Sequence, residues 1–68
     1  MTSLTMRERT VLKWAAMEKP YNEIADICGI WERTVKYHMA NVVHKLDVST
    51  AKQAVIVESR LGLSALNV

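Results

Sequence analysis

A single glycine, Gly29, separates two apolar stripes of helical spacing, and this arrangement constrains the fold more than any other feature. The stripe before it is short and runs from Ile24 to Cys28. The stripe after it repeats at intervals of 4, 3 and 4 residues from Val35 to Leu46, which is the spacing of one buried helix face. Because glycine adopts the positive φ that a tight turn needs, two helices can cross at this point. The sequence therefore predicts a helix-turn-helix.

The face opposite the second stripe is polar. If that stripe points inward, the residues that point outward at about 100° per residue are Arg33, Lys36, Tyr37, Ala40, Asn41 and His44. Arginine and lysine bond guanine edges or phosphates, and asparagine pairs with adenine in the major groove of DNA. An ordinary solvated helix face also carries these residue types. The pattern by itself leaves both interpretations open.

The net charge of +2 is small for a chain that binds nucleic acid, but it is unevenly distributed. Four basic residues balance four acidic ones over residues 1–30, whereas residues 31–52 carry four basic and two acidic residues. The excess lies on the second helix of the motif and the turn after it, where DNA would be met. Such a patch implies roughly three to five phosphate contacts per protomer, so we expect DNA binding as a dimer or with a tether.

Length and composition indicate one small ordered domain. The chain has 68 residues, half of them hydrophobic, and leaves no room for a second, ligand-sensing domain. Its single cysteine, Cys28, cannot form an intramolecular disulfide, and its helical spacing from Ile24 favours a packed thiol over a nucleophile. No apolar run approaches the roughly 20 residues of a membrane span, and no signal-peptide pattern begins the chain. We expect a cytoplasmic protein without a membrane partner.

Two helices are expected before the glycine break, and the second of them is the first helix of the motif. Thr5 and Glu8 have the spacing of a capping box, which begins a first helix. That helix is expected to end between Met17 and Pro20. Asn22 is then the predicted N-cap of the second helix.

A fourth helix is expected from Ser49 or Thr50, either of which can cap it, to about Gly62. Three apolar residues share one face of this helix: Ala54, Val57 and Leu61. Ile56 and Leu63 fall elsewhere and suggest contact with a partner helix. Isolated exposed aliphatic residues are also normal, so that alternative stays open.

Several motifs, in the same order and spacing, resemble the DNA-binding domain of LuxR-type transcription regulators. They are Leu4-Thr5-Met6-Arg7-Glu8-Arg9-Thr10-Val11-Leu12-Lys13-Trp14, Glu23-Ile24-Ala25, Gly29-Ile30, Arg33-Thr34-Val35-Lys36-Tyr37-His38, Lys45-Leu46 and Gln53-Ala54. The resemblance covers residues 4–64 and leaves tails at 1–3 and 65–68. Trp14 and the run from Tyr37 through Val43 resemble the quorum-sensing branch more than the response-regulator branch. The resemblance implies an all-α domain of four helices, whose third helix (about 32–46) enters the major groove and whose fourth pairs two protomers on a two-fold symmetric site.

The resemblance also implies roles for single residues. The base-contacting positions correspond to Lys36, Tyr37, Ala40 and Asn41, the DNA-backbone positions to Arg33, Thr34, His44, Lys45 and Thr50, and the dimerisation positions to Ile56, Arg60 and Leu63. Ala40 can touch a thymine methyl but cannot hydrogen-bond, so Lys36 and Asn41 are expected to carry specificity. His38 matches a family histidine at the edge of the core stripe, where a packed, hydrogen-bonded side chain is favoured over a base reader.

Four positions depart from the family pattern. Glu18 stands where relatives have glycine, which costs about 1 kcal/mol if the backbone there is left-handed. Trp31 replaces a serine N-cap of the third helix, a loss of about 0.5–2 kcal/mol. Ala51 replaces a basic residue, and Glu58 lies toward the core where a small residue is expected. These changes predict a less stable and weaker DNA binder.

Two functional hypotheses follow. In the first, the chain is the DNA-binding part of a quorum-sensing type regulator that binds double-stranded DNA, as a homodimer, and recruits or blocks RNA polymerase. In the second, a stand-alone domain pairs through its last helix with a full-length regulator and inhibits it. An enzyme is disfavoured, because no zinc-type spacing, acid pair or glycine-rich phosphate loop is present. No catalytic residue, metal, cofactor or small-molecule ligand is predicted. A full-length relative is expected to carry an N-terminal domain that binds an acyl-homoserine lactone.

Overall fold

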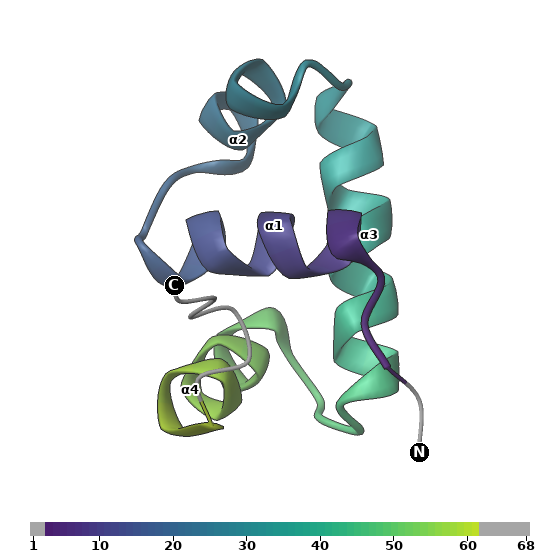
Figure 1. The fold of residues 1–68 in the computed structure, drawn as a ribbon, viewed down its shortest axis with the longest axis vertical. Coiled ribbons are helices and arrows are strands. Elements are labelled where there is room, and N and C mark those ends of the chain that lie inside the picture. The colour runs from purple at the N-terminus through teal and green to yellow at the C-terminus, as the bar shows by residue number, and fades with distance from the viewer. Residues whose placement is uncertain (1–2, 62–68) are drawn as a thin grey trace.

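The computed structural model describes residues 3–61, and within this range every regular element is a helix. The four are α1 (Met6–Ala16), α2 (Tyr21–Cys28), α3 (Glu32–Lys45) and α4 (Ala51–Leu61). In Figure 1, α3 runs along one side of the molecule and α1 lies across it, with α2 above α1 and α4 below. This arrangement confirms the predicted all-α fold of four helices.

The first helix begins as the sequence predicts. The hydroxyl Oγ1 of Thr5 accepts a hydrogen bond from the backbone N–H of Glu8 at 3.1 Å. In return, the backbone N–H of Thr5 donates to Oε1 of Glu8 at 2.9 Å. This reciprocal pair is a complete capping box, and it satisfies two N–H groups that would otherwise lack partners at the helix start.

Three helices end on a residue in the left-handed region of the backbone. These residues are Glu18 (φ 63°), Gly29 (φ 69°) and Asp47 (φ 57°). After each of them, a backbone N–H donates to the carbonyl five positions earlier: Lys19 to Trp14 at 3.1 Å, Ile30 to Ala25 at 3.0 Å, and Val48 to Val43 at 3.2 Å. The backbone of Glu18 is left-handed, so the condition stated for this position is met and a cost of about 1 kcal/mol relative to glycine applies. At Gly29 a Cβ atom would meet nothing within 4 Å, so this position needs glycine for its φ angle alone.

The prediction that Asn22 caps the second helix is wrong. Its N-cap is Pro20, two residues earlier, and the helix begins at Tyr21. The ring of Pro20 holds φ at −68°, and its carbonyl accepts hydrogen bonds from the backbone N–H groups of Glu23 and Ile24 at 3.0 Å. Proline supplies the extended cap conformation through its ring, so no side-chain cap is made.

The fourth helix follows Thr50, one of the two predicted caps. Its hydroxyl Oγ1 accepts from the backbone N–H of Gln53 at 3.2 Å. The amide oxygen Oε1 of Gln53 in turn accepts from the backbone N–H of Ser49 at 2.7 Å. Both predicted starting residues thus take part in holding the first turn of α4. The predicted end near Gly62 and the predicted contact residue Leu63 lie outside the described residues.

The core lies where the four helices meet. Its largest fully buried side chains come from the first three helices: Val11, Leu12, Ile24, Val35 and Val42. The smaller Ala54 of α4 is fully buried with them. Of the predicted inner stripe of α3, Met39 is also buried and Leu46 is half-buried against the core. Cys28 packs there as a half-buried free thiol, and the carboxylate-bearing side chain of Glu58 is buried as expected. With one face of α3 fixed inward, its opposite face is left in solvent.

Candidate nucleic-acid interface

The turn at Gly29 holds α2 and α3 at the geometry that leaves the outer face of α3 free. On the side of α1, the guanidinium group of Arg7 donates to the carbonyl of Cys28 at 3.4 Å. This contact places a cation at the C-terminal end of α2, where unpaired carbonyl groups favour positive charge. The helix-turn-helix pair is therefore anchored on α1 as well as joined by its turn.

The predicted base-contacting residues share the outer face of α3. Lys36, Tyr37 and Ala40 are exposed, and Asn41 is half-buried. Opposite them, Val35, Met39 and Val42 are buried. Among the predicted backbone-contacting residues of α3, Arg33 and His44 are exposed, whereas Thr34 and Lys45 are half-buried. The structure thus places the exposed members of both sets on one side of one helix.

Two cations near the start of α3 make no close ion pair within residues 3–61. Nζ of Lys36 lies 3.8 Å from Oε2 of Glu32, and the two side chains are 62% and 49% exposed. An exposed pair at this distance contributes little stability, so the ammonium group of Lys36 can leave it at small cost. Arg33 lies over the ring of Trp31, with 4.1 Å from its Cζ to the ring centroid. As expected for the missing serine, Trp31 makes no side-chain cap on α3.

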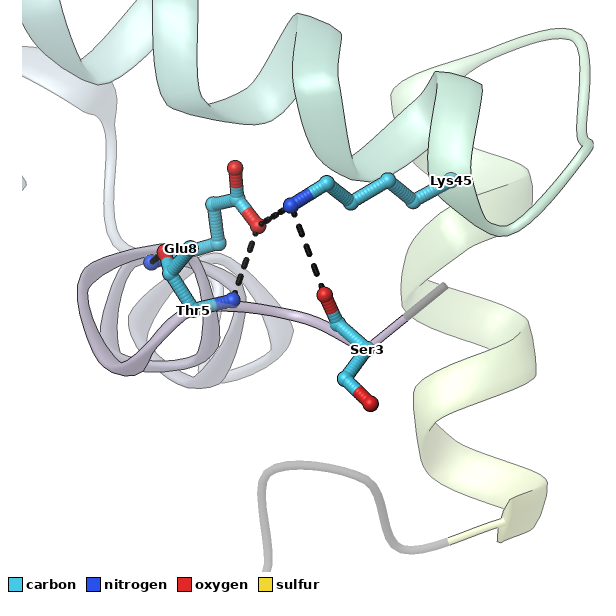
Figure 2. Close-up of polar contacts among 4 residues, drawn as sticks. All are labelled: Ser3, Thr5, Glu8 and Lys45. Carbon is cyan, nitrogen blue, oxygen red and sulfur yellow. Dashed lines mark hydrogen bonds and ion pairs between the residues drawn. The ribbon is translucent and has the colours of Figure 1, made fainter. Parts of the chain in front are cut away.

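Lys45 at the end of α3 is bound inside the domain. Figure 2 shows its Nζ between two acceptors of the N-terminal segment: Oε1 of Glu8 at 2.8 Å and the carbonyl of Ser3 at 3.4 Å. The side chains of Glu8 and Lys45 are 5% and 21% exposed. Burial of the Glu8 carboxyl raises its pKa, but the hydrogen bonds from Lys45 and Thr5 and the charge of Lys45 outweigh burial, so the pKa lies below its ordinary value. The ammonium group of Lys45 therefore donates to α1 and to the segment before it.

Sequence reasoning identified Glu8 as a capping residue and missed its ion pair with Lys45. An available signal was the position of this acid within the apolar stripe of α1, because a buried carboxylate needs a charged partner. The sequence did not indicate which lysine that partner would be.

His38 lies at the edge of the core, as predicted, and is half-buried beside Tyr37, with 5.6 Å between the ring centroids. The predicted hydrogen bond is absent at Nδ1: this atom is buried and has no partner among residues 3–61. The side chain is held by packing against its neighbours, which sequence spacing could indicate, whereas a specific polar partner could not be inferred from it.

A shallow groove lies between the α3–α4 loop and α4. Its lining residues are Asp47, Val48, Ser49, Gln53, Ile56, Val57 and Arg60. Two of the three predicted dimerisation residues, Ile56 and Arg60, belong to this lining, and Ile56 is 46% exposed. The loop residues of the groove were not singled out from the sequence, because only the helix shows a periodic pattern.

Within residues 3–61, no three histidine, cysteine, aspartate or glutamate side chains gather as a metal site. None of the described helices has the length and apolar character needed to cross a membrane.

The fold and the exposed face of α3 define the class: this is a helix-turn-helix domain. The family described as GerE, bacterial regulatory proteins of the luxR family, matches residues 2–58. A solved structure of the transcription factor GerE superposes with a TM-score of 0.83 at 33% identity, covering 93% of this chain and 94% of that one. The chain therefore belongs to the luxR family, as a DNA-binding helix-turn-helix domain.

Curated relatives are similar over most of this chain. The transcriptional activator protein YukR of Yersinia ruckeri is 57% identical over 60 residues, which are 88% of this chain and 24% of the relative. EsaR of Pantoea stewartii, also named a transcriptional activator, is 53% identical over 91% of this chain and 23% of its own length. The quorum sensing-dependent regulator RpaR of Rhodopseudomonas palustris is 44% identical over 93% of this chain and 26% of its own. These names agree with the predicted quorum-sensing branch, and the chain spans about a quarter of each relative.

Proposed function

We propose that this domain binds double-stranded DNA in a sequence-specific manner, with α3 in the major groove, and thereby regulates transcription. The observation that carries the proposal is the division of α3 into two faces. Val35, Met39 and Val42 are buried, while Lys36 and Tyr37 on the other face are exposed. A rigid helix with its polar side chains in solvent is the element that helix-turn-helix proteins insert into the groove.

Base recognition is assigned to four residues of this face: Lys36, Tyr37, Ala40 and Asn41. Lys36 is the principal candidate, since within residues 3–61 its ammonium group is paired only with the exposed Glu32 carboxylate. Asn41 is half-buried and presents an amide that can pair with adenine. Ala40 offers only an apolar contact, so specificity rests on its neighbours.

Contacts to the DNA backbone are assigned to Arg33, Thr34, His44, Lys45 and Thr50. Arg33 and His44 are exposed and can reach phosphates directly. Lys45 and Thr50 already have partners within the domain, Glu8 and the backbone of Gln53. Their contribution to phosphate binding is therefore expected to be smaller than that of Arg33.

We further propose that two protomers pair through α4 on a two-fold symmetric site, using Ile56, Arg60 and Leu63. The exposed Ile56 side chain and the groove beside it support this surface. The same surface would serve the second hypothesis, in which this domain pairs with a full-length regulator and inhibits it. In that case substitution of Ile56 abolishes activity while Lys36→Ala does not.

We also propose a wider role as part of a quorum-sensing type transcription regulator, which the relatives' names support. That the regulator acts in the cytoplasm, contacts RNA polymerase at promoters and has no catalytic activity is part of the same proposal and rests on membership of the family.

The test is fluorescence anisotropy of a labelled, two-fold symmetric duplex enriched from a random library. Lys36→Ala is expected to weaken binding by about 1–3 kcal/mol, because one base contact is lost. Lys19→Ala is the matched control: it removes the same charge from an ion pair with Glu23 that lies outside α3, and should leave affinity within about twofold. Equal losses in both variants would indicate general charge attraction, and no enrichment would contradict DNA reading altogether.

A further inference from the structure

Trp31 lies at the N-cap of α3 and contributes little to the core. Its surface is 66% exposed, and its side chain makes no cap hydrogen bond with the helix. Its ring instead faces the guanidinium group of Arg33, whose Cζ lies 4.1 Å from the ring centroid. In Figure 1 the start of α3 lies beside α2, at the opposite end of the helix from the α4 loop.

Arg33 differs from the two lysines of α3 in its partners. Lys36 and Lys45 each have a carboxylate, from Glu32 and Glu8. Among the ion pairs of residues 3–61 none includes Arg33, whose described contact is the indole ring. Its positive charge is therefore left for an external anion.

Stacking arranges the guanidinium group for such an anion. The Cζ atom lies over the ring at 4.1 Å, so the ring occupies one side of the group. The N–H donors of a guanidinium group lie in its plane, where two of them can bond a phosphate together. An arginine side chain in solvent samples many rotamers, and contact with the indole restricts them. Less freedom is then lost when the phosphate binds.

We propose that Trp31 is a positioning residue, which holds Arg33 toward a phosphate of the DNA backbone at the start of α3. This inference rests on the proposed function, because it assumes that this face of α3 meets DNA. Trp31 would then contribute to DNA affinity through the side chain of Arg33, although it makes no side-chain cap at the N-cap position of α3.

The variant Trp31→Ser separates this role from a structural one. Serine is a favoured N-cap, so the substitution should raise the melting temperature of the domain by restoring a hydrogen bond to the first turn of α3. It also removes the ring beneath Arg33 and should therefore weaken DNA binding. A residue that acted only through stability would shift both quantities in the same direction.

The experiment uses the full 68-residue chain and a fluorescein-labelled 30-bp duplex of mixed sequence, because phosphate contacts need no particular sequence. Arg33→Ala should weaken binding and lower the slope of log affinity against log salt by about 1. Trp31→Ser should weaken binding by about 3–10-fold, whereas Trp31→Phe, which keeps an aromatic ring, should stay within about twofold of wild type. In the Arg33→Ala background, Trp31→Ser should cause no further loss of affinity. Lys13→Ala is the matched control, since Lys13 also lies over a tryptophan ring, Trp14, but in α1; it should leave affinity within about twofold.

The proposal is overturned if Trp31→Ser binds as tightly as wild type, or if its loss persists undiminished in the Arg33→Ala background. Failure of the proposed function gives a different result. In that case wild type binds neither this duplex nor the selected one, or Lys36→Ala leaves binding to the selected duplex unchanged. Coupling between Trp31 and Arg33 together with an unchanged Lys36→Ala variant would support the positioning role while removing base reading by Lys36.

Discussion

The starts of α1 and α3 carry similar residues whose contacts differ in burial and in strength. Each helix has a glutamate in its first turn, Glu8 or Glu32, and each glutamate pairs with a lysine. The pair of Glu8 is close, at 2.8 Å, and nearly buried, whereas the pair of Glu32 is at 3.8 Å and exposed. Because attraction between charges strengthens as water is excluded, the first pair holds the fold together and the second leaves its lysine available.

The caps of the two helices differ in the same way. Thr5 completes a capping box, while Trp31 leaves α3 without a side-chain cap and stacks on Arg33. Stabilising contacts are thus concentrated where α1 meets the end of α3. The start of α3 instead presents side chains to solvent, which is what a binding surface requires.

The largest expected effect tests this division directly. Glu8→Ala should lower the free energy of unfolding by about 2–4 kcal/mol, because it leaves Lys45 without its carboxylate and removes half of the capping box. Glu32→Ala, the matched control in α3, should cost less than about 1 kcal/mol. Urea denaturation followed by circular dichroism gives both values. Similar losses would show that the two ion pairs do not differ as their burial suggests.

The pH dependence of stability should single out the same carboxyl group. The pKa of Glu8 is lowered in the folded state from an ordinary value of 4.5, so its contribution is complete above that value and is lost as the pH falls through the folded pKa. The difference in unfolding free energy between wild type and Glu8→Gln should therefore be largest near pH 7 and shrink near pH 3. Urea denaturation at the two pH values measures it, and a difference that stays constant would contradict the ionised pair.

The smallest effect compares the two caps. Thr5→Ala should lower the melting temperature, at a cost of about 1 kcal/mol, because the N–H of Glu8 loses its acceptor. Trp31→Ala should change stability by less than about 0.5 kcal/mol, since no cap is lost and the ring is mostly exposed. Thermal unfolding checks both. A larger loss for Trp31→Ala would mean that its stack with Arg33 stabilises the domain as well.

Much of the fold was readable from local patterns. Spacing of 3 and 4 residues predicted the buried stripe of Val35, Met39 and Val42, and the Thr5–Glu8 spacing predicted the first cap. The family resemblance marked Glu18 as standing in place of a glycine, and the backbone there is left-handed. It also predicted the loss of a side-chain cap at Trp31, and no such cap is made. These features succeed because each depends on residues within a few positions of one another.

Features that depend on chemical detail or on distant residues were missed. Asp47 takes a left-handed conformation as Glu18 does. The sequence analysis did not predict it, although aspartate adopts this region more often than most residues. Asn22 is a good N-cap by type, yet the ring geometry of Pro20 starts the helix earlier. His38 packs as expected without the predicted hydrogen bond at Nδ1. The propensity of a residue type says only that it can form a cap or a hydrogen bond. Whether it does so depends on the residues that surround it in the fold.

By itself, the sequence determined four helices, the break at Gly29 and the inward face of α3, because helix periodicity and turn chemistry act over short distances. Only the tertiary structure decided that Lys45 binds Glu8, 37 positions away, while Lys36 remains near solvent. Both lysines lie on the same helix and look alike in the sequence. Packing of α1 against α3 half-buries Lys45 beside a carboxylate. This difference in burial separates a lysine that stabilises the fold from one that is available for binding.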